Sequence, residues 1–235
     1  MTRAVLLDFY NTLVHFDPPR ERIQREVGAR YGLALEEAAL RRAYAAADDF
    51  WNSQNIASPA SRRSPEEQRH FFARYQQLIL KEAGAPVSLE LAGHIFDEVR
   101  RYPSQWVSFD DVAPALEALR RRGCALGLVS NVQRDLTALL ERLGIAPHLD
   151  FVVTSAEAGL EKPHPPIFRL ALQKAQVEAS QALHVGDQYS SDVLGARGVG
   201  IRPLLLDRHD TYGHHADVVR IKRLTEIEEH LDGAG

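Results

Sequence analysis

The chain has 235 residues, of which 45% are hydrophobic and 26% are charged, and its formal net charge is −4. This composition is typical of a globular protein and excludes a fibrous or intrinsically disordered chain. The acidic balance gives no general attraction to nucleic acid or anionic lipid, and no apolar run approaches the ~18 residues of a membrane span. We therefore expect a soluble protein that binds neither nucleic acid nor membrane, and because cysteine is so rare we expect a reducing, cytoplasmic environment. A single cysteine, Cys124, excludes an internal disulfide.

The first predicted element is a buried strand that begins at Ala4 and delivers Asp8 to its carboxyl end. The residues from Ala4 to Leu7 are all apolar, as in a parallel strand that is covered on both faces. Because this strand starts so early, we expect no signal peptide. Open α/β sheets bind ligands outside the carboxyl ends of their strands. Asp8 is therefore a candidate for chemistry, although an isolated aspartate there is more commonly a turn residue.

Residues 15–107 have helical spacing and almost no strand signal. Ile23, Val27 and Tyr31 recur on one helical face, and Ser64 followed by Pro65 is a typical helix start. The segment interrupts the sheet directly after Asp8, so we expect a helical cap domain that covers the strand end as a lid. The predicted helices span residues 20–31, 36–51, 65–83 and 88–101, with a loop over 52–64.

From residue 108 onward, helical and strand patterns alternate, which is typical of doubly wound α/β architecture. The predicted fold class is therefore α/β: a doubly wound parallel-sheet (Rossmann-like) core, formed by residues 1–14 and 108–235, with an inserted all-helical cap domain over residues 15–107. The predicted strands of this part span 124–130, 150–154, 182–186 and 201–206, and the predicted helices span 111–122, 132–143, 165–175, 191–197 and 224–231.

Polar residues follow several of these strands. The second strand ends in Ser130-Asn131, the fourth ends before Asp187 with Asp192 five residues later, and the loop after the third carries Lys162. Each has an ordinary structural role in isolation, as a cap, a turn residue or a surface lysine. The carboxyl ends of parallel strands share one edge of a sheet, so we expect these residues to converge with Asp8.

With this set of motifs, in this order, the chain resembles the haloacid dehalogenase superfamily of aspartate-nucleophile hydrolases over essentially its whole length, including the helical cap. The resemblance implies that Asp8 is the nucleophile, that Lys162 balances the charge around nucleophile and substrate, and that the metal is Mg²⁺. The remaining implied roles are substrate binding by Thr12, Ser130 and Asn131, and metal binding by Asp8, Asp187, Asp192 and the backbone carbonyl of Tyr10.

Elementary electrostatics agrees with these roles. Two carboxylates 4 Å apart repel by about 4 kcal/mol at an effective dielectric constant near 20, so a converging group of three needs a cation. Oxygen ligands without cysteine favour a hard ion such as Mg²⁺. The metal and Lys162 would let the anionic Asp8 approach an anionic phosphate. We therefore expect a phosphatase that acts on a small phosphorylated metabolite through an aspartyl-phosphate on Asp8.

Tyr10 departs from the pattern of the phosphatases in this superfamily, which carry a second aspartate two residues after the nucleophile as general acid and base. Tyrosine has an unperturbed pKa near ~10 and is a poor base at neutral pH. The L-2-haloacid dehalogenase branch is similar in having tyrosine here, so carbon–halogen hydrolysis through an aspartyl ester is the alternative. Against it, that branch works without a metal and lacks the Gly186-Asp187 pair. A second alternative is a catalytically weak binding protein with the same fold.

Overall fold

The computed structural model describes residues 1–58 and 63–231. The chain divides into two compact units, one formed by Met1–His15 with Val107–Gly235 and the other by Phe16–Trp106. Both boundaries fall within short strands, β2 (Val14–Asp17) and β3 (Gln105–Ser108), which pair as a two-stranded sheet. The sequence predicted neither strand, because four residues with mostly half-buried side chains give almost no alternation to detect.

The first unit is built on a six-stranded parallel sheet of order β5-β4-β1-β6-β7-β8. Strand β1 lies in the middle, because the chain adds β4 and β5 on one side of it and β6 to β8 on the other. This reversal is a topological switch point, where open α/β sheets bind their ligands. The predicted doubly wound α/β fold is confirmed. The strands are β1 (Ala4–Leu7), β4 (Ala125–Ser130), β5 (Phe151–Thr154), β6 (Ala182–Gly186), β7 (Arg202–Leu206) and β8 (Arg220–Ile221).

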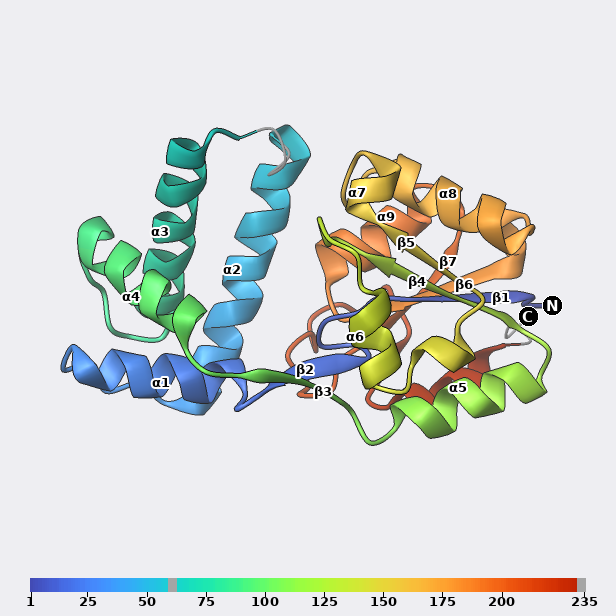
Figure 1. Cartoon of the computed structure of the whole chain (residues 1–235), viewed down its shortest axis with the longest axis horizontal. Coiled ribbons are helices and arrows are strands. Elements are labelled where there is room, and N and C mark those ends of the chain that lie inside the picture. The colour runs from blue at the N-terminus through green and yellow to red at the C-terminus, as the bar shows by residue number, and fades with distance from the viewer. Residues whose placement is uncertain (59–62, 232–235) are drawn as a thin grey trace. The chain divides into compact units, whose positions relative to one another are not determined.

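Helices cover both faces of this sheet (Figure 1), with α8 and α9 on one face and α5 on the other. Ile167 and Phe168 of α8 are fully buried in a cluster with Leu6 of β1 and Val129 of β4. This packing removes the central strands from water, which explains why their sequences are continuous apolar runs. The helices are α5 (Val112–Arg121), α6 (Thr137–Arg142), α7 (Ser155–Ala158), α8 (Pro165–Ala175) and α9 (Leu194–Arg197); a π-helical turn spans Tyr189–Val193, and 3₁₀ turns span Ala146–His148, Ala179–Gln181 and Leu224–His230.

In its described residues, the second unit consists of four helices around their own apolar core. Ser64 caps the third of them by accepting a hydrogen bond from the backbone N–H of Glu67, whose side chain in turn accepts one from the Ser64 N–H. This capping box confirms the predicted start of that helix. None of the helices in the described part of the chain is long and apolar enough to cross a membrane. The helices are α1 (Arg20–Arg30), α2 (Glu37–Ala57), α3 (Pro65–Glu82) and α4 (Leu89–Arg101).

Four of the predicted helices were wrong in a boundary or in helix type. Helix α2 continues to Ala57, beyond the loop expected from Asn52, which is instead buried at 1% exposure; residues 59–62 of that loop lie outside the described residues. The helix expected from Val132 begins only at Thr137, where Asp135 accepts hydrogen bonds from the Thr137 backbone N–H and hydroxyl. The last helix is a 3₁₀ turn, and a π-helical turn replaces the start of the helix expected over 191–197.

A buried ion pair ties the turn after Asp8 to the rest of the first unit. The Arg208 guanidinium donates hydrogen bonds of 2.8 and 3.0 Å to the two carboxylate oxygens of Asp111 and one of 2.9 Å to the backbone carbonyl of Thr12. Burial alone would raise the pKa of Asp111, but hydrogen bonds from Arg208 and from the Leu224 backbone N–H lower it below its usual value. Asp111 is therefore ionised at neutral pH and stabilises the fold there.

Replacing Asp111 by asparagine is expected to lower the free energy of unfolding by about 3 kcal/mol, because it leaves the guanidinium of Arg208 buried without its counter-ion. The native pKa lies below the unfolded value, so this stabilisation is present above about pH 4 and is lost as the pH falls. Urea denaturation at several pH values measures both effects. The control is Asp110→Asn, whose exposed pair with Arg223 predicts little change. Equal losses in the two variants would contradict the assignment.

Candidate active site

Lys162 lies between two carboxylates at the centre of the candidate site. Its ammonium Nζ is 2.5 Å from Oδ1 of Asp8 and 2.6 Å from Oδ1 of Asp192. The lysine side chain is 2% exposed, and both carboxylates are buried as well. Charges are rarely buried in this way without a partner, and the three groups come from segments far apart in the sequence. The fold therefore brings together three residues that the sequence placed at separate strand ends.

Asp187 completes a cluster of carboxylates. One oxygen each from Asp8, Asp187 and Asp192 lie within 4.8 Å of one another. Three carboxylates and one lysine leave a net negative charge, and the donor set consists of oxygens alone. Both features fit a hard divalent cation such as Mg²⁺, which commonly binds one or two carboxylates and keeps water or substrate oxygens as its other ligands.

The pKa values show where positive charge is still needed. Burial would lower the pKa of Lys162, but Asp192 and Asp8 raise it, so the ammonium stays protonated. Burial would raise the pKa of Asp192, but the charge of Lys162 and the hydrogen bond from His184 hold it well below its usual range. For Asp8, burial prevails over Lys162 and the pKa is raised, with a contribution from the like charge of Asp192. Asp8 is therefore the carboxylate that a second cation would stabilise most.

Gly186 is required by the position of Asp192. A Cβ atom at residue 186 would lie 2.1 Å from Cγ of Asp192, far inside van der Waals contact. The carboxylate therefore packs directly against the end of β6, and its Oδ2 accepts a hydrogen bond of 3.1 Å from the Gln188 backbone N–H. The glycine before Asp187 is thus explained by the close approach of the Asp192 side chain to the backbone.

Ser130 and Asn131 follow β4, the strand beside β1. Ser130 is buried at the carboxyl end of the strand. The side-chain amide of Asn131 makes two hydrogen bonds to the backbone of Lys162. Its Oδ1 accepts one of 2.6 Å from the Lys162 N–H, and its Nδ2 donates one of 3.0 Å to the Lys162 carbonyl. Substrate binding by Asn131, which the family resemblance implies, stays a prediction; the contacts show in addition that Asn131 holds the backbone at Lys162.

Tyr10 and Thr12 lie in the turn that follows Asp8. Tyr10 is half-buried, and its backbone bridges to Val14. Thr12 is fully buried, and its hydroxyl has no hydrogen-bond partner among the residues that the structure describes. Asn11, between them, has a φ of 58°, the left-handed conformation that asparagine tolerates in tight turns. The turn thus carries both residues directly after the carboxyl end of β1.

Sequence reasoning missed the role of His184, which contacts Asp192 from inside β6. Its only signal was a histidine within an otherwise apolar strand.

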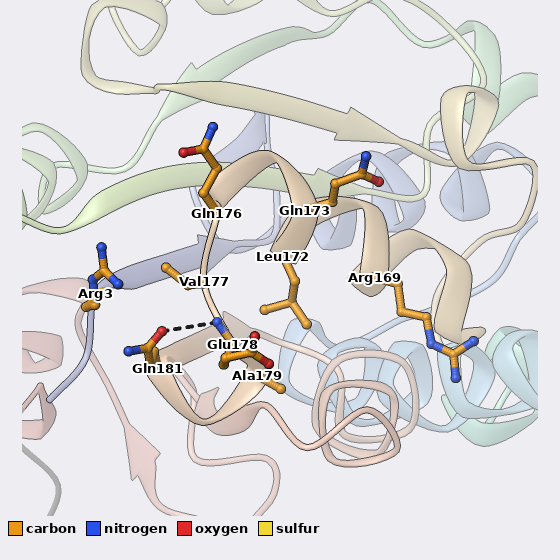
Figure 2. A pocket seen from close by; sticks show the side chains of 9 residues that line it. All are labelled: Arg3, Arg169, Leu172, Gln173, Gln176, Val177, Glu178, Ala179 and Gln181. Atoms are coloured by element: carbon orange, nitrogen blue, oxygen red, sulfur yellow. Dashed lines mark hydrogen bonds between the residues drawn. The ribbon is translucent and has the colours of Figure 1, made fainter.

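A separate pocket of about 600 Å³ lies at the amino ends of the strands, between Arg3, helix α8 and Gln181 (Figure 2). Figure 2 shows that Gln181 hydrogen-bonds the Glu178 backbone N–H. This pocket is at the opposite end of the sheet from Asp8 and does not belong to the site.

Comparison with known sequences gives a consistent family. The haloacid dehalogenase-like hydrolase family matches residues 2–200. The chain is 39% identical to zebrafish haloacid dehalogenase-like hydrolase domain-containing protein 3 over 54% of this chain and 52% of that protein, so the match spans about half the length of that relative. It is 31% identical to the phosphoserine phosphatase of Thermus thermophilus over 88% of this chain and 89% of that enzyme.

Two solved structures share the fold. A 2-haloacid dehalogenase from Pseudomonas syringae is 25% identical, with a TM-score of 0.57 over 99% of both chains. A Bacillus subtilis protein described as a HAD-hydrolase and bound to magnesium is 17% identical, with a TM-score of 0.63 over 98% of this chain and 99% of that one. One of these proteins is named for dehalogenation and the other only as a hydrolase, so the fold by itself does not assign the reaction. With its parallel sheet, its inserted helices and the family match over most of its length, the chain belongs to the haloacid dehalogenase-like hydrolases.

Proposed function

We propose that this protein is a Mg²⁺-dependent phosphatase that hydrolyses small phosphorylated metabolites through a phosphorylated Asp8. The observation that carries the proposal is the buried Lys162 ammonium between Asp8 and Asp192, with Asp187 in reach of both carboxylates. The phosphoserine phosphatase of Thermus thermophilus supports the reaction class. The magnesium in the Bacillus subtilis structure supports the choice of metal.

In this reaction a carboxylate oxygen of Asp8 attacks phosphorus, and the bond from phosphorus to the leaving oxygen breaks as the new bond forms. Water then attacks the phosphorus atom, the bond between phosphorus and the Asp8 oxygen breaks, and inorganic phosphate leaves as the carboxylate is restored. The proton that the water loses to solvent balances the proton that the leaving oxygen takes up. Lys162 holds Asp8 in place and offsets its charge, while the hydroxyls of Ser130 and Thr12 are suited to donate to phosphoryl oxygens. Mg²⁺, held by Asp8, Asp187, Asp192 and the Tyr10 carbonyl, would supply further positive charge beside the phosphoryl group.

Dehalogenation is the second candidate, and Tyr10 favours it. A halide ion leaves without a proton, so the absence of the second aspartate as general acid does not slow the first step. Asp187 argues against it, because without a metal its negative charge would repel the carboxylate of a haloacid. Asp187 has no evident use in a metal-free reaction, so we favour phosphate hydrolysis.

Tyr10 predicts a restricted set of phosphatase substrates. Without a general acid near neutral pKa, alkyl phosphates with basic leaving groups are expected to turn over poorly, and aryl or acyl phosphates better. Tyr10→Asp is expected to raise the rate for an alkyl phosphate by roughly 10²-fold, within the usual range of general acid–base catalysis, and to change the aryl rate much less. Steady-state rates for a matched pair of substrates measure this. Equal wild-type rates for the two leaving groups would contradict the prediction.

A screen of phosphate esters and 2-haloacids, each with and without Mg²⁺, tests the proposed function itself. The expected result is release of inorganic phosphate that requires Mg²⁺ and stops when EDTA is added. Halide release without metal would overturn the proposal in favour of the dehalogenase. No turnover of either class, combined with Asp8→Asn protein that keeps its biological activity, would favour a binding protein instead.

A further inference from the structure

His184 is a polar ring at the centre of the first unit's sheet. It lies in β6, is 0% exposed, and has apolar neighbours in the strand on both sides. Its ring meets Phe168 edge to face, with the centroids 5.2 Å apart. A valine or leucine would fill a buried strand position without the cost of desolvating an imidazole. His184 therefore needs a reason beyond packing, and its contact with Asp192 gives one.

The surroundings of His184 define where its proton lies. Nε2 is 2.9 Å from Oδ1 of Asp192, whereas Nδ1 is buried and has no hydrogen-bond partner in the described part of the chain. A proton on Nδ1 would leave a buried N–H unpaired and would direct the Nε2 lone pair at a carboxylate. A proton on Nε2 instead makes a charge-assisted hydrogen bond to Asp192. The form with its proton on Nε2 is therefore the one that fits.

This bond fixes the carboxylate that holds Lys162. Oδ1 of Asp192 accepts hydrogen bonds from both His184 and Lys162, and Oδ2 accepts one from the Gln188 backbone N–H. The carboxylate also rests on Gly186, where no Cβ atom would fit. Because hydrogen-bond donors contact both carboxylate oxygens and the Gly186 backbone lies against the carboxylate, the Asp192 side chain is held in one orientation. That orientation places the Lys162 ammonium against Asp8.

We propose that His184 is a positioning residue, whose Nε2–H fixes Asp192 and thereby holds Lys162 against Asp8. His184 touches neither substrate nor the reacting atoms in this account. The inference rests on the proposed function for its effect on turnover, but the geometry it describes belongs to the protein without substrate.

Two amide variants separate positioning from packing. The Nε2 of glutamine reaches the place of the histidine Nε2, so His184→Gln keeps a donor on Asp192. The shorter asparagine places its amide near the position of Nδ1, so His184→Asn does not. We expect His184→Asn to lower kcat by roughly 10–100-fold and to weaken Mg²⁺ binding to a similar extent, as losses of groups that orient metal ligands do, with a smaller change in KM. His184→Gln should stay within about 3-fold of wild type, because its donor is retained.

The measurements are kcat and KM for a phosphate ester, Mg²⁺ binding by calorimetry, and thermal unfolding of both variants. Losses that are equal in the two variants and follow their unfolding temperatures would overturn the proposal, since they would indicate packing alone. Wild-type behaviour of His184→Asn would also overturn it. If wild type hydrolyses no phosphate ester, the proposed function fails, and Mg²⁺ binding still tests the positioning role.

A measurement on the wild-type protein covers the case in which the variants do not fold. Long-range ¹H–¹⁵N correlation spectra distinguish the two neutral tautomers of histidine. We expect the His184 ring to show the Nε2–H pattern at neutral pH in the protein without added metal. An Nδ1–H pattern would overturn the proposal, because Nε2 would then have no proton to donate.

Discussion

Asp8→Asn is expected to reduce phosphatase activity by roughly 10⁴–10⁶-fold, the range measured when members of a covalent catalytic unit are removed. The amide retains the size of the carboxylate but lacks the negative oxygen that attacks phosphorus. The fold should persist, because Lys162 keeps its 2.6 Å contact with Asp192. Steady-state assays at saturating Mg²⁺, together with thermal unfolding, measure both expectations.

The matched control is Asp110→Asn, which makes the same chemical change at an exposed position that pairs with Arg223 on the surface. This variant should retain wild-type activity. If Asp8→Asn kept more than a tenth of the wild-type rate while folded, the nucleophile would be a different group, and the assignment of the site around Asp8 would fail.

Lys162→Met is expected to damage both activity and stability. The substitution leaves Asp8 and Asp192 buried without the ammonium that lies 2.5 and 2.6 Å from them. Breaking a buried charge pair by removing one partner costs about 3–5 kcal/mol of folding free energy. Loss of a preorganised positive group beside developing negative charge is expected to lower kcat by about 10²–10³-fold. Urea denaturation and steady-state kinetics measure the two effects.

Lys174→Met is the control for this prediction. Lys174 also pairs with a carboxylate, at 2.7 Å from Glu157, but the pair is exposed and outside the site. Its replacement should change stability little and leave turnover intact. A Lys162→Met protein that is as stable and as active as Lys174→Met would show that the buried ammonium has no part in either.

Local patterns were enough to predict the parts of this fold whose cause is local. The apolar runs of β1, β4 and β6 predicted the central strands of the sheet, and Ser64 followed by Pro65 predicted the start of α3. The polar residues at the strand ends indicated where the site would be. Asp8, Lys162 and Asp192 meet as expected, because adjacent parallel strands end at the same edge.

Features that depend on distant contacts could not be predicted in the same way. Asn131 pairs with the backbone of Lys162, a residue 31 positions away, and no local pattern indicates this contact. The need for glycine at residue 186 follows from the Asp192 carboxylate that rests on it. The role of His184 depends on the same carboxylate, and a single histidine in an apolar strand does not reveal its partner.

The proposed function depends on phosphorylation of Asp8 during turnover in the presence of Mg²⁺. Rapid acid quench of the enzyme with a ³²P-labelled aryl phosphate, followed by digestion and mass spectrometry, tests it directly. We expect protein-bound label on the peptide that contains Asp8, and we expect it to be absent with EDTA and absent in Asp8→Asn. Release of inorganic phosphate without any label on that peptide, or with label on another residue, would contradict it.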